Sequence, residues 1–159
     1  MNNSEINLDS AQAVLDEHRK KLEQFSELLV AENKKYNLTR IDSPEQIWVR
    51  HFLDSLAGLS ALDTLAQKTE KALRILDIGS GAGFPGLVLA IVRPAWQVVS
   101  LEATAKKAKF QKMICDNLGL DNVTVLNERA EAVAHHAAYR IAWTHCGHRQ
   151  CFAGCPFCS

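Results

Sequence analysis

The residues of this chain most suited to chemistry are three glycines at alternate positions, Gly79, Gly81 and Gly83, which follow an apolar run. Because glycine has no Cβ atom, a turn built from them can bend sharply and bring its backbone close to a ligand. Residues 84 to 92 read as a helix that Pro94 stops, so the turn would present backbone N–H groups at a helix start. This pattern is typical of a loop that binds a nucleotide-like cofactor.

Two acidic residues flank this loop. Glu102 ends the next apolar run, about 20 residues past the glycines, where a Rossmann-type site places the carboxylate that accepts hydrogen bonds from ribose hydroxyls. Asp77 precedes the first glycine and could either hydrogen-bond the loop or reach the bound cofactor. We therefore expect Glu102 to contact a nucleoside, and we favour a structural role for Asp77.

The composition indicates one ordinary domain, or a small α/β domain with a helical extension. The chain has 159 residues, of which 18 are Lys or Arg and 18 are Asp or Glu, so no net charge draws it to nucleic acid. No apolar run is long enough to cross a bilayer, and the first ten residues lack a signal-peptide pattern. We expect a cytoplasmic monomer whose RNA contacts, if it has any, come from local clusters.

Helical and strand patterns alternate in a way that predicts an α/β fold. We expect a long amphipathic helix to about residue 33 and a second one that begins at Ser43 and Pro44 and reaches Leu59. A polar connection at residues 63–71 would lead into strands at residues 73–78, 98–101 and 123–126, with a helix at residues 105–118 between the last two. Such a sheet should be parallel and covered on both faces.

After about residue 140 the pattern breaks. The last 19 residues hold four of the five cysteines and show neither strand nor helix period. We therefore divide the chain into an N-terminal helical cap (residues 1–62), a partial Rossmann-like core that stops after its third strand (residues 63–140) and an aberrant Cys-rich tail (residues 141–159).

Four motifs resemble the RsmG (GidB) family of bacterial 16S rRNA guanine-N7 methyltransferases. They are Tyr36-Asn37-Leu38-Thr39, Arg50-His51-Phe52-Leu53-Asp54-Ser55, Asp77-Ile78-Gly79-Ser80-Gly81-Ala82-Gly83-Phe84-Pro85-Gly86 and Val92-Arg93-Pro94. The resemblance covers roughly residues 10 to 139. It implies an S-adenosylmethionine-dependent enzyme with a Rossmann-like methyltransferase fold, acting on ribosomal RNA or the assembling small subunit.

The resemblance also implies roles for individual positions. Gly79, Gly81 and Phe84 would line the methionine and ribose side of the cofactor, while Ala130 and Glu131 would lie beside the adenine. The family has an Arg just after its fourth strand, and this chain offers no match for it. Because the core is also shortened, we expect impaired methylation by this chain.

Basic residues near the site are candidates for RNA contact. Lys106 and Lys107 begin the helix after Glu102, near the sheet edge where ligands bind, and either contact phosphates or are simply solvated. Arg50 and His51 either reach RNA and cofactor or pin the second helix to the sheet. No catalytic residue is identified. None is required as a general base, because guanine N7 carries a free lone pair and catalysis would come mainly from positioning.

Two alternatives remain open. A nicotinamide-dependent oxidoreductase would share the acid after the second strand, although the glycine spacing differs from G-x-G-x-x-G. A non-catalytic zinc-binding fragment would use the tail, where Cys155 and Cys158 form a C-x₂-C pair near Cys146 and Cys151. A second C-x₂-C pair is missing, so we assign no metal site.

We interpret the tail as the product of a reading-frame slip near Tyr139 or Arg140. Read from the second base of the His145 codon, the degenerate codons permit the sequence (Thr/Ile)-(Val/Ala)-Val-Thr-Ala, an apolar β-run. The coding DNA decides this hypothesis, since a stop codon or polar sequence in that frame contradicts it.

Overall fold

The computed structural model describes residues 8–70, 72–130, 141–146 and 149–152. Its cap begins with two helices, α1 (Leu8–Glu17) and α2 (Arg19–Tyr36), where the sequence predicted one. The break falls at His18, whose φ of −104° and ψ of 13° depart from helical values. At the other end, Asn37 adopts a left-handed conformation (φ 50°) and its N–H bonds Asn33 O at 2.9 Å, which ends α2.

The second predicted helix is also divided. It consists of α3 (Pro44–Ile47), the π-helical turn η1 (Trp48–Leu53) and, after a turn, α4 (Leu59–Thr69). Its predicted start is confirmed, because Ser43 Oγ caps α3 by accepting a hydrogen bond from Gln46 N at 3.2 Å. The polar connection predicted at residues 63–71 was wrong for residues 63–69, which continue α4. Leu59 and Leu62 of this helix are buried at helical spacing, and the predicted boundary between residues 62 and 63 falls inside it.

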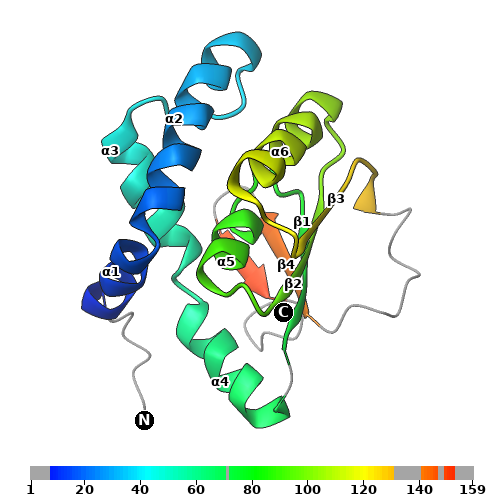
Figure 1. The fold of residues 1–159 in the computed structure, drawn as a ribbon. Coiled ribbons are helices and arrows are strands. Elements are labelled where there is room, and N and C mark those ends of the chain that lie inside the picture. Colours follow the sequence, from blue (N-terminus) through cyan, green and yellow to red (C-terminus); the bar gives the residue numbers. More distant parts are fainter. Residues whose placement is uncertain (1–7, 71, 131–140, 147–148, 153–159) are drawn as a thin grey trace.

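The predicted βαβ units are present. They run through β1 (Arg74–Ile78), α5 (Gly86–Val92), β2 (Gln97–Leu101), α6 (Ala105–Leu118) and β3 (Val123–Leu126). All three strands are parallel, with β1 paired to β2 and β2 to β3. This confirms a Rossmann-like parallel sheet behind an N-terminal helical cap (Figure 1).

The prediction that the sheet stops after its third strand was wrong. β4 (Ile141–Cys146) pairs parallel with β1, and β5 (Arg149–Phe152) pairs antiparallel with β4, giving the order β3-β2-β1-β4-β5. Without β4, β1 would be an edge strand with unpaired backbone groups, and pairing them requires only extended backbone. Ile141, Trp143 and Thr144 all favour that conformation. The first part of the Cys-rich tail is therefore part of the sheet.

Both described crossover helices lie on the same face of the sheet. Figure 1 shows α5 and α6 between the sheet and the cap. This follows from topology, because two successive right-handed crossovers that advance in one direction place their helices on one side. The expectation that helices cover both faces is not met within the described residues, where the opposite face carries a small cluster around Leu76 and Leu101. The β3-to-β4 connection, residues 131–140, lies outside that part of the chain.

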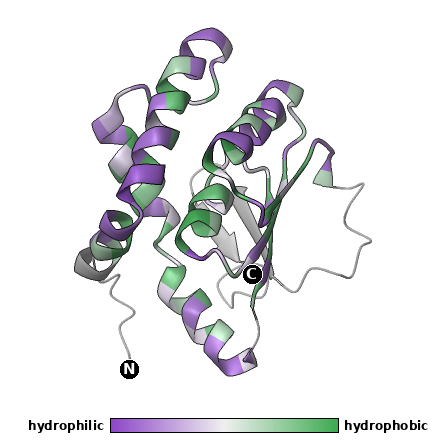
Figure 2. Cartoon of the chain, in the orientation of Figure 1, coloured by the Kyte–Doolittle hydropathy of each residue, from purple (hydrophilic) through white to green (hydrophobic). Residues whose placement is uncertain are grey.

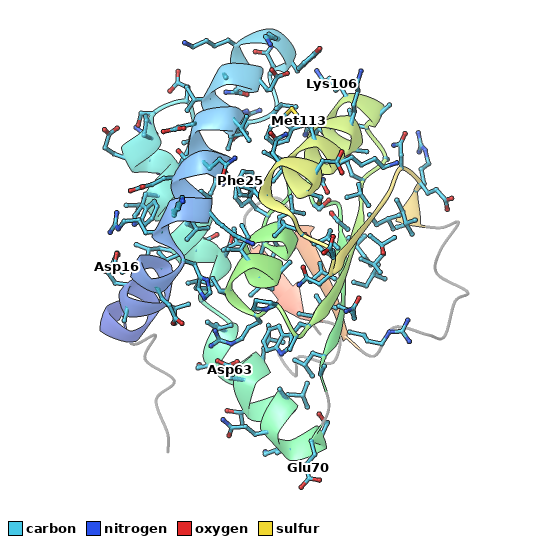
Figure 3. All side chains as sticks on the ribbon, in the orientation of Figure 1. Asp16, Phe25, Asp63, Glu70, Lys106 and Met113 are labelled. Carbon is cyan, nitrogen blue, oxygen red and sulfur yellow. The ribbon has the colours of Figure 1, made fainter. Side chains whose placement is uncertain are left out.

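The main core fills the space between the cap, α5, α6 and the near face of the sheet. Every residue of α5 is buried, and Figure 2 shows this helix as hydrophobic throughout. From the cap, Phe25 is fully buried and points from α2 towards α5 and α6 (Figure 3). The helical cap and the sheet thus share one hydrophobic core, so the cap holds a fixed position above the glycine turn. No helix among the described residues is long and apolar enough to cross a membrane.

Candidate functional site

The glycine turn joins β1 to α5 with three left-handed residues. Gly79, Gly81 and Gly83 have φ values of 73°, 59° and 102°. A Cβ atom added to Gly79 or Gly81 would meet no heavy atom within 4 Å, whereas one added to Gly83 would lie 2.8 Å from a methyl carbon of Leu87. Gly79 and Gly81 therefore border open space, and Gly83 serves the packing of the turn against α5.

A cavity of about 150 Å³ lies between the turn and the cap. The turn supplies five of its lining residues, Gly79, Ser80, Gly81, Ala82 and Phe84, and the cap supplies Leu38, Thr39 and His51. Cap residues that lie far from the turn in sequence thus cover the open space at Gly79 and Gly81.

Aromatic stacking joins the cap to the turn. The His51 ring lies parallel to the Phe84 ring with centroids 4.3 Å apart, and Phe84 is also stacked with Phe25 at 5.2 Å. His51 Nε2 lies 3.0 Å from Thr39 Oγ1, and Thr39 N donates to Asn33 Oδ1 at 2.9 Å. These contacts fix the orientation of the Thr39 and His51 side chains, two of the three cap residues that line the cavity.

Glu102 is 6% exposed and holds two backbone N–H groups at the carboxyl end of β2. Its Oε2 accepts from Gly81 N at 2.8 Å and its Oε1 accepts from Thr104 N at 2.7 Å. A carboxylate oxygen can accept a second hydrogen bond. Glu102 therefore positions the turn and retains the capacity to accept from a ligand hydroxyl.

Asp77 takes the structural role that the sequence favoured. It is fully buried, and its Oδ2 accepts from Gly86 N at 2.8 Å. Burial raises the pKa of this carboxyl to about 8; the Gly86 N–H opposes the rise and the charge of Glu102 adds to it. Its Oδ1 is buried without a hydrogen-bond partner among the described residues. The neutral carboxyl at this site fits such a buried environment.

A polar network on α6 contacts the turn from another side. Gln111 is fully buried and its Nε2 donates to Ser80 Oγ and to Gly81 O, both at 2.8 Å. Ser100 Oγ bonds Gln111 Oε1 and lies 2.6 Å from Ser80 Oγ. The turn is thus held by β2 through Ser100 and Glu102, and by α6 through Gln111.

The remaining predicted site residues lie around this centre. Ala130 is half-buried and packs against the small cluster on the far face of the sheet, while Glu131 lies outside the described residues. Arg50 is exposed on η1, and Lys106 projects from the first turn of α6, with Lys107 half-buried beside it (Figure 3). Of the four candidates for RNA contact, His51 alone lines the cavity.

Sequence reasoning missed five residues of the site: Leu38, Thr39, Ser80, Ala82 and Gln111. Leu38 and Thr39 stood within a recognised motif, and Ser80 and Ala82 stood between the glycines, so their proximity to a ligand could have been inferred. Gln111 gave no such signal, because a glutamine on a helix is usually solvated and its burial depends on tertiary packing.

A larger hollow lies on the outer side of the cap, away from the glycine turn. It measures about 580 Å³ and runs between α2 and α3, with Arg19, Glu23, Glu27, Lys34 and Trp48 among its lining residues. The Arg19 guanidinium lies over the Trp48 ring, 4.9 Å from its centroid, so these two side chains of the hollow already contact each other. It contains none of the residues that the sequence associates with a cofactor.

Within the described ranges, no three His, Cys, Asp or Glu residues form a group that could hold a metal ion. Cys155 and Cys158, on which the zinc alternative depends, lie outside those ranges.

Comparison with known proteins shows which family this chain resembles. Residues 18–144 match the family model GidB, described as rRNA small subunit methyltransferase G. The match extends beyond residue 139, where the motif resemblance ended. A protein of that name from Mycoplasma mycoides is 41% identical, over 79% of this chain and 87% of its own length. One from Azoarcus is 48% identical, over 67% of this chain and 47% of its own length.

The length of the relatives differs from that of this chain. The match covers 56% of a relative from Microcystis aeruginosa that is 40% identical, so the chain spans about half the length of most of these proteins. Among solved structures, a human methyltransferase 10 domain containing protein shares the fold, with a TM-score of 0.50 at 16% identity, over 89% of this chain and 63% of the other. The comparisons give no support to an oxidoreductase.

Proposed function

The chain belongs to the GidB family of small-subunit rRNA methyltransferases, and from this premise we propose that it binds S-adenosylmethionine between the glycine turn and the cap. The reaction is methyl transfer to N7 of a guanine in 16S rRNA. The observation that carries the proposal is the empty space beside Gly79 and Gly81, which the cap residues cover. There the backbone can approach a ligand without a side chain in between.

The described residues fit this cofactor. Pockets that enclose a whole ligand of this size usually measure roughly 300 to 1,000 Å³, so the cavity of about 150 Å³ accommodates one end of it. Gly79, Gly81 and Phe84 border that end. Glu102, bonded to Gly81, accepts from the ribose hydroxyls. The resemblance to the family assigns the adenine to Ala130 and to Glu131, which lies outside the described residues.

The chemistry makes few demands on protein side chains. The bound cofactor supplies an electrophilic methyl group on a sulfonium centre. Guanine N7 attacks with its own lone pair, so a general base is unnecessary. The protein's contribution is to hold the two reactants in line, which is worth roughly 7 to 11 kcal/mol in favourable cases.

The RNA approaches over the same edge of the sheet. Lys106 and Lys107 at the start of α6 and Arg50 on η1 contact phosphates, while His51 reaches the cavity from the cap. The enzyme works as a monomer in the cytoplasm, on ribosomal RNA or the assembling small subunit. Its activity is lower than that of relatives whose sequence keeps the family pattern beyond residue 144.

The test compares two glycines with the same backbone strain. Gly81 and Gly119 have φ values of 59° and 61°, and an added Cβ meets nothing within 4 Å at either position, but only Gly81 lines the cavity. Gly81→Ala and Gly119→Ala should each cost roughly 1–2 kcal/mol of stability. In calorimetry with S-adenosylhomocysteine, Gly81→Ala is expected to lose at least tenfold in affinity and Gly119→Ala to match the unmodified chain.

Equal affinities of the two variants would contradict the proposed site. Titration with NADH in place of S-adenosylhomocysteine addresses the oxidoreductase alternative, for which we expect no heat of binding. Methylation of purified small subunits with a labelled methyl donor, followed by nucleoside analysis for 7-methylguanosine, tests the reaction itself.

A further inference from the structure

A ring of three buried polar side chains lies between the glycine turn and α6. Its members are Gln111 on α6, Ser100 on β2 and Ser80 in the turn, and none is more than 2% exposed. Buried polar groups of this kind destabilise a fold unless each has a partner. The ring is therefore informative only if its hydrogen bonds can all be satisfied together.

Counting hydrogens shows that they can. Each serine hydroxyl carries one hydrogen, and the three side chains contact one another pairwise. If Ser100 donates to Gln111 Oε1, Ser80 donates to Ser100 and Gln111 Nε2 donates to Ser80, each group in the ring donates once and accepts once. The second hydrogen on Gln111 Nε2 remains, and it is donated to Gly81 O at 2.8 Å.

This last bond reaches the residue that borders the cavity. Gly81 O accepts from Gln111 while Gly81 N donates to Glu102 Oε2 at 2.8 Å. Gly81 is thus held through both of its backbone polar groups by side chains that come from two different elements. A glycine with φ near 59° has wide conformational freedom, so these two bonds select one orientation from many.

We propose that Gln111 is a positioning residue for cofactor binding, acting through the Gly81 peptide. The buried ring fixes the amide of Gln111, and Gln111 fixes the wall of the cavity that Gly79, Ser80 and Gly81 form. This inference rests on the proposed function, because it assigns to that wall the S-adenosylmethionine site. Gln111 itself touches neither the cofactor nor the reacting atoms.

The test replaces Gln111 by methionine, which is similar in length but cannot donate to Gly81. Calorimetry with S-adenosylhomocysteine is expected to show roughly a tenfold loss of affinity in Gln111→Met. Ser100→Ala, which opens the ring, should weaken binding in the unmodified chain and add little on top of Gln111→Met, because both changes disrupt one network.

Ile114→Val is the matched control. Ile114 is fully buried on the same helix and belongs to the hydrophobic core, so its truncation lowers stability without touching the turn. It should leave the affinity for S-adenosylhomocysteine unchanged. If Gln111→Met also keeps the unmodified affinity while losing similar stability, Gln111 is a packing residue and the inference is overturned.

A second measurement separates this inference from the proposed function. Amide hydrogen exchange in the ligand-free chain should be faster across residues 79–82 in Gln111→Met than in Ile114→Val. Unaltered exchange there contradicts the positioning role even if the cofactor binds. Failure of the unmodified chain to bind S-adenosylhomocysteine, with faster exchange in Gln111→Met, contradicts the proposed function and leaves the role of Gln111 in shaping the turn intact.

Discussion

Gly86 lies where α5 begins, directly against the buried carboxyl of Asp77. A Cβ atom added to Gly86 would stand 2.6 Å from Asp77 Oδ2, a separation that requires the carboxyl or the helix to move. The Gly86 N–H also donates to that oxygen at 2.8 Å. Close approach of backbone to a side chain, rather than a special dihedral angle, explains the glycine at this position.

We predict that Gly86→Ala is more destabilising than Gly119→Ala. The first change displaces a buried hydrogen bond and should cost roughly 2–4 kcal/mol, whereas the second adds only backbone strain of roughly 1–2 kcal/mol. Chemical unfolding monitored by circular dichroism measures both. Equal losses would show that the Asp77 carboxyl moves aside without cost.

The raised pKa of Asp77 predicts a dependence of stability on pH. The carboxyl has a pKa of about 8 in the folded chain against an ordinary value of 3.8, so it is ionised in the unfolded chain but neutral in the fold between these limits. Its contribution to stability is fully present below pH 4 and is lost as the pH rises through 8. The unmodified chain should therefore lose on the order of a few kcal/mol between pH 5 and pH 8.

Asp77→Asn removes the ionisation while keeping an oxygen that can accept from Gly86. Its free energy of unfolding should fall less over the same pH range, measured in urea at several pH values. Asp116→Asn, at an exposed position on α6, is the control and should follow the unmodified chain. Parallel curves for Asp77→Asn and the unmodified chain would contradict the prediction.

At this scale the sequence predicted that Glu102 meets the glycine turn, but not that Gln111 supports it. The placement of Gly81 and Glu102 follows from spacing, since a turn after one strand and an acid after the next must meet at the same edge of a parallel sheet. The support from Gln111, by contrast, depends on which face α6 turns towards β2. That orientation is set by packing with the cap, which a local pattern does not contain.

Among the elements, α4 is the connection between the cap and the sheet, and an ion pair ties it to the end of α5. Arg93 Nε and Nη2 donate to the two carboxylate oxygens of Asp63 at 2.8 and 2.6 Å, and Nη1 donates to Val92 O at 2.8 Å. Both side chains are roughly 30% exposed, at 28% and 31%. Figure 3 marks Asp63 on α4. The paired geometry resists rotation of α4 against the core.

A double-mutant cycle measures this pair. Arg93→Met and Asp63→Asn should show a coupling free energy on the order of 1 kcal/mol in unfolding experiments. The matched control is the pair Lys35 and Glu32 within α2, whose lysine is 62% exposed and which should show no measurable coupling. Similar values for the two cycles would remove the case for α4 as an anchored connection.

Element prediction failed where tertiary context decides the structure. Residues 63–69 of α4 were assigned to a polar connection because few apolar side chains follow Leu62, and the burial of Leu59 and Leu62 depends on the core beneath them. β4 was missed because its segment was judged together with the cysteine-rich residues after it. The unpaired edge of β1 can pair with extended backbone largely irrespective of its side chains. The need to pair this edge therefore predicts β4 better than the side chains of residues 141–146 do.

For the molecule as a whole, the main contrast is between a glycine-turn site that lies within the described residues and a match to the family that ends at residue 144. The sheet contains β1 and β2 with their neighbours, and cap residues cover the cavity, so the binding of S-adenosylhomocysteine should be measurable. We predict that it is weaker than in a relative such as the Azoarcus protein, compared by calorimetry under the same conditions, because the residues after 144 depart from the family pattern. Equal affinities would contradict this prediction.

The reading-frame hypothesis gives the second prediction at this scale. A variant in which translation continues from the second base of the His145 codon is expected to bind S-adenosylhomocysteine more tightly than the present chain. The reason is that β4 lies next to β1, so the residues after β4 should emerge at the sheet edge where the glycine turn lies. Sequencing the coding DNA is the first step, and unchanged affinity of the variant would count against the hypothesis.

The ring stack of His51, Phe84 and Phe25 has a practical consequence for anyone studying this protein. Phe84 borders the cavity, whereas Phe25 belongs to a helix of the cap, and their rings are only 7° from parallel. Fluorine introduced on Phe25 would therefore give a spectroscopic signal sensitive to events at the glycine turn while remaining buried and out of the way of any ligand. Occupancy could be followed by nuclear magnetic resonance without labelling the cofactor or the RNA.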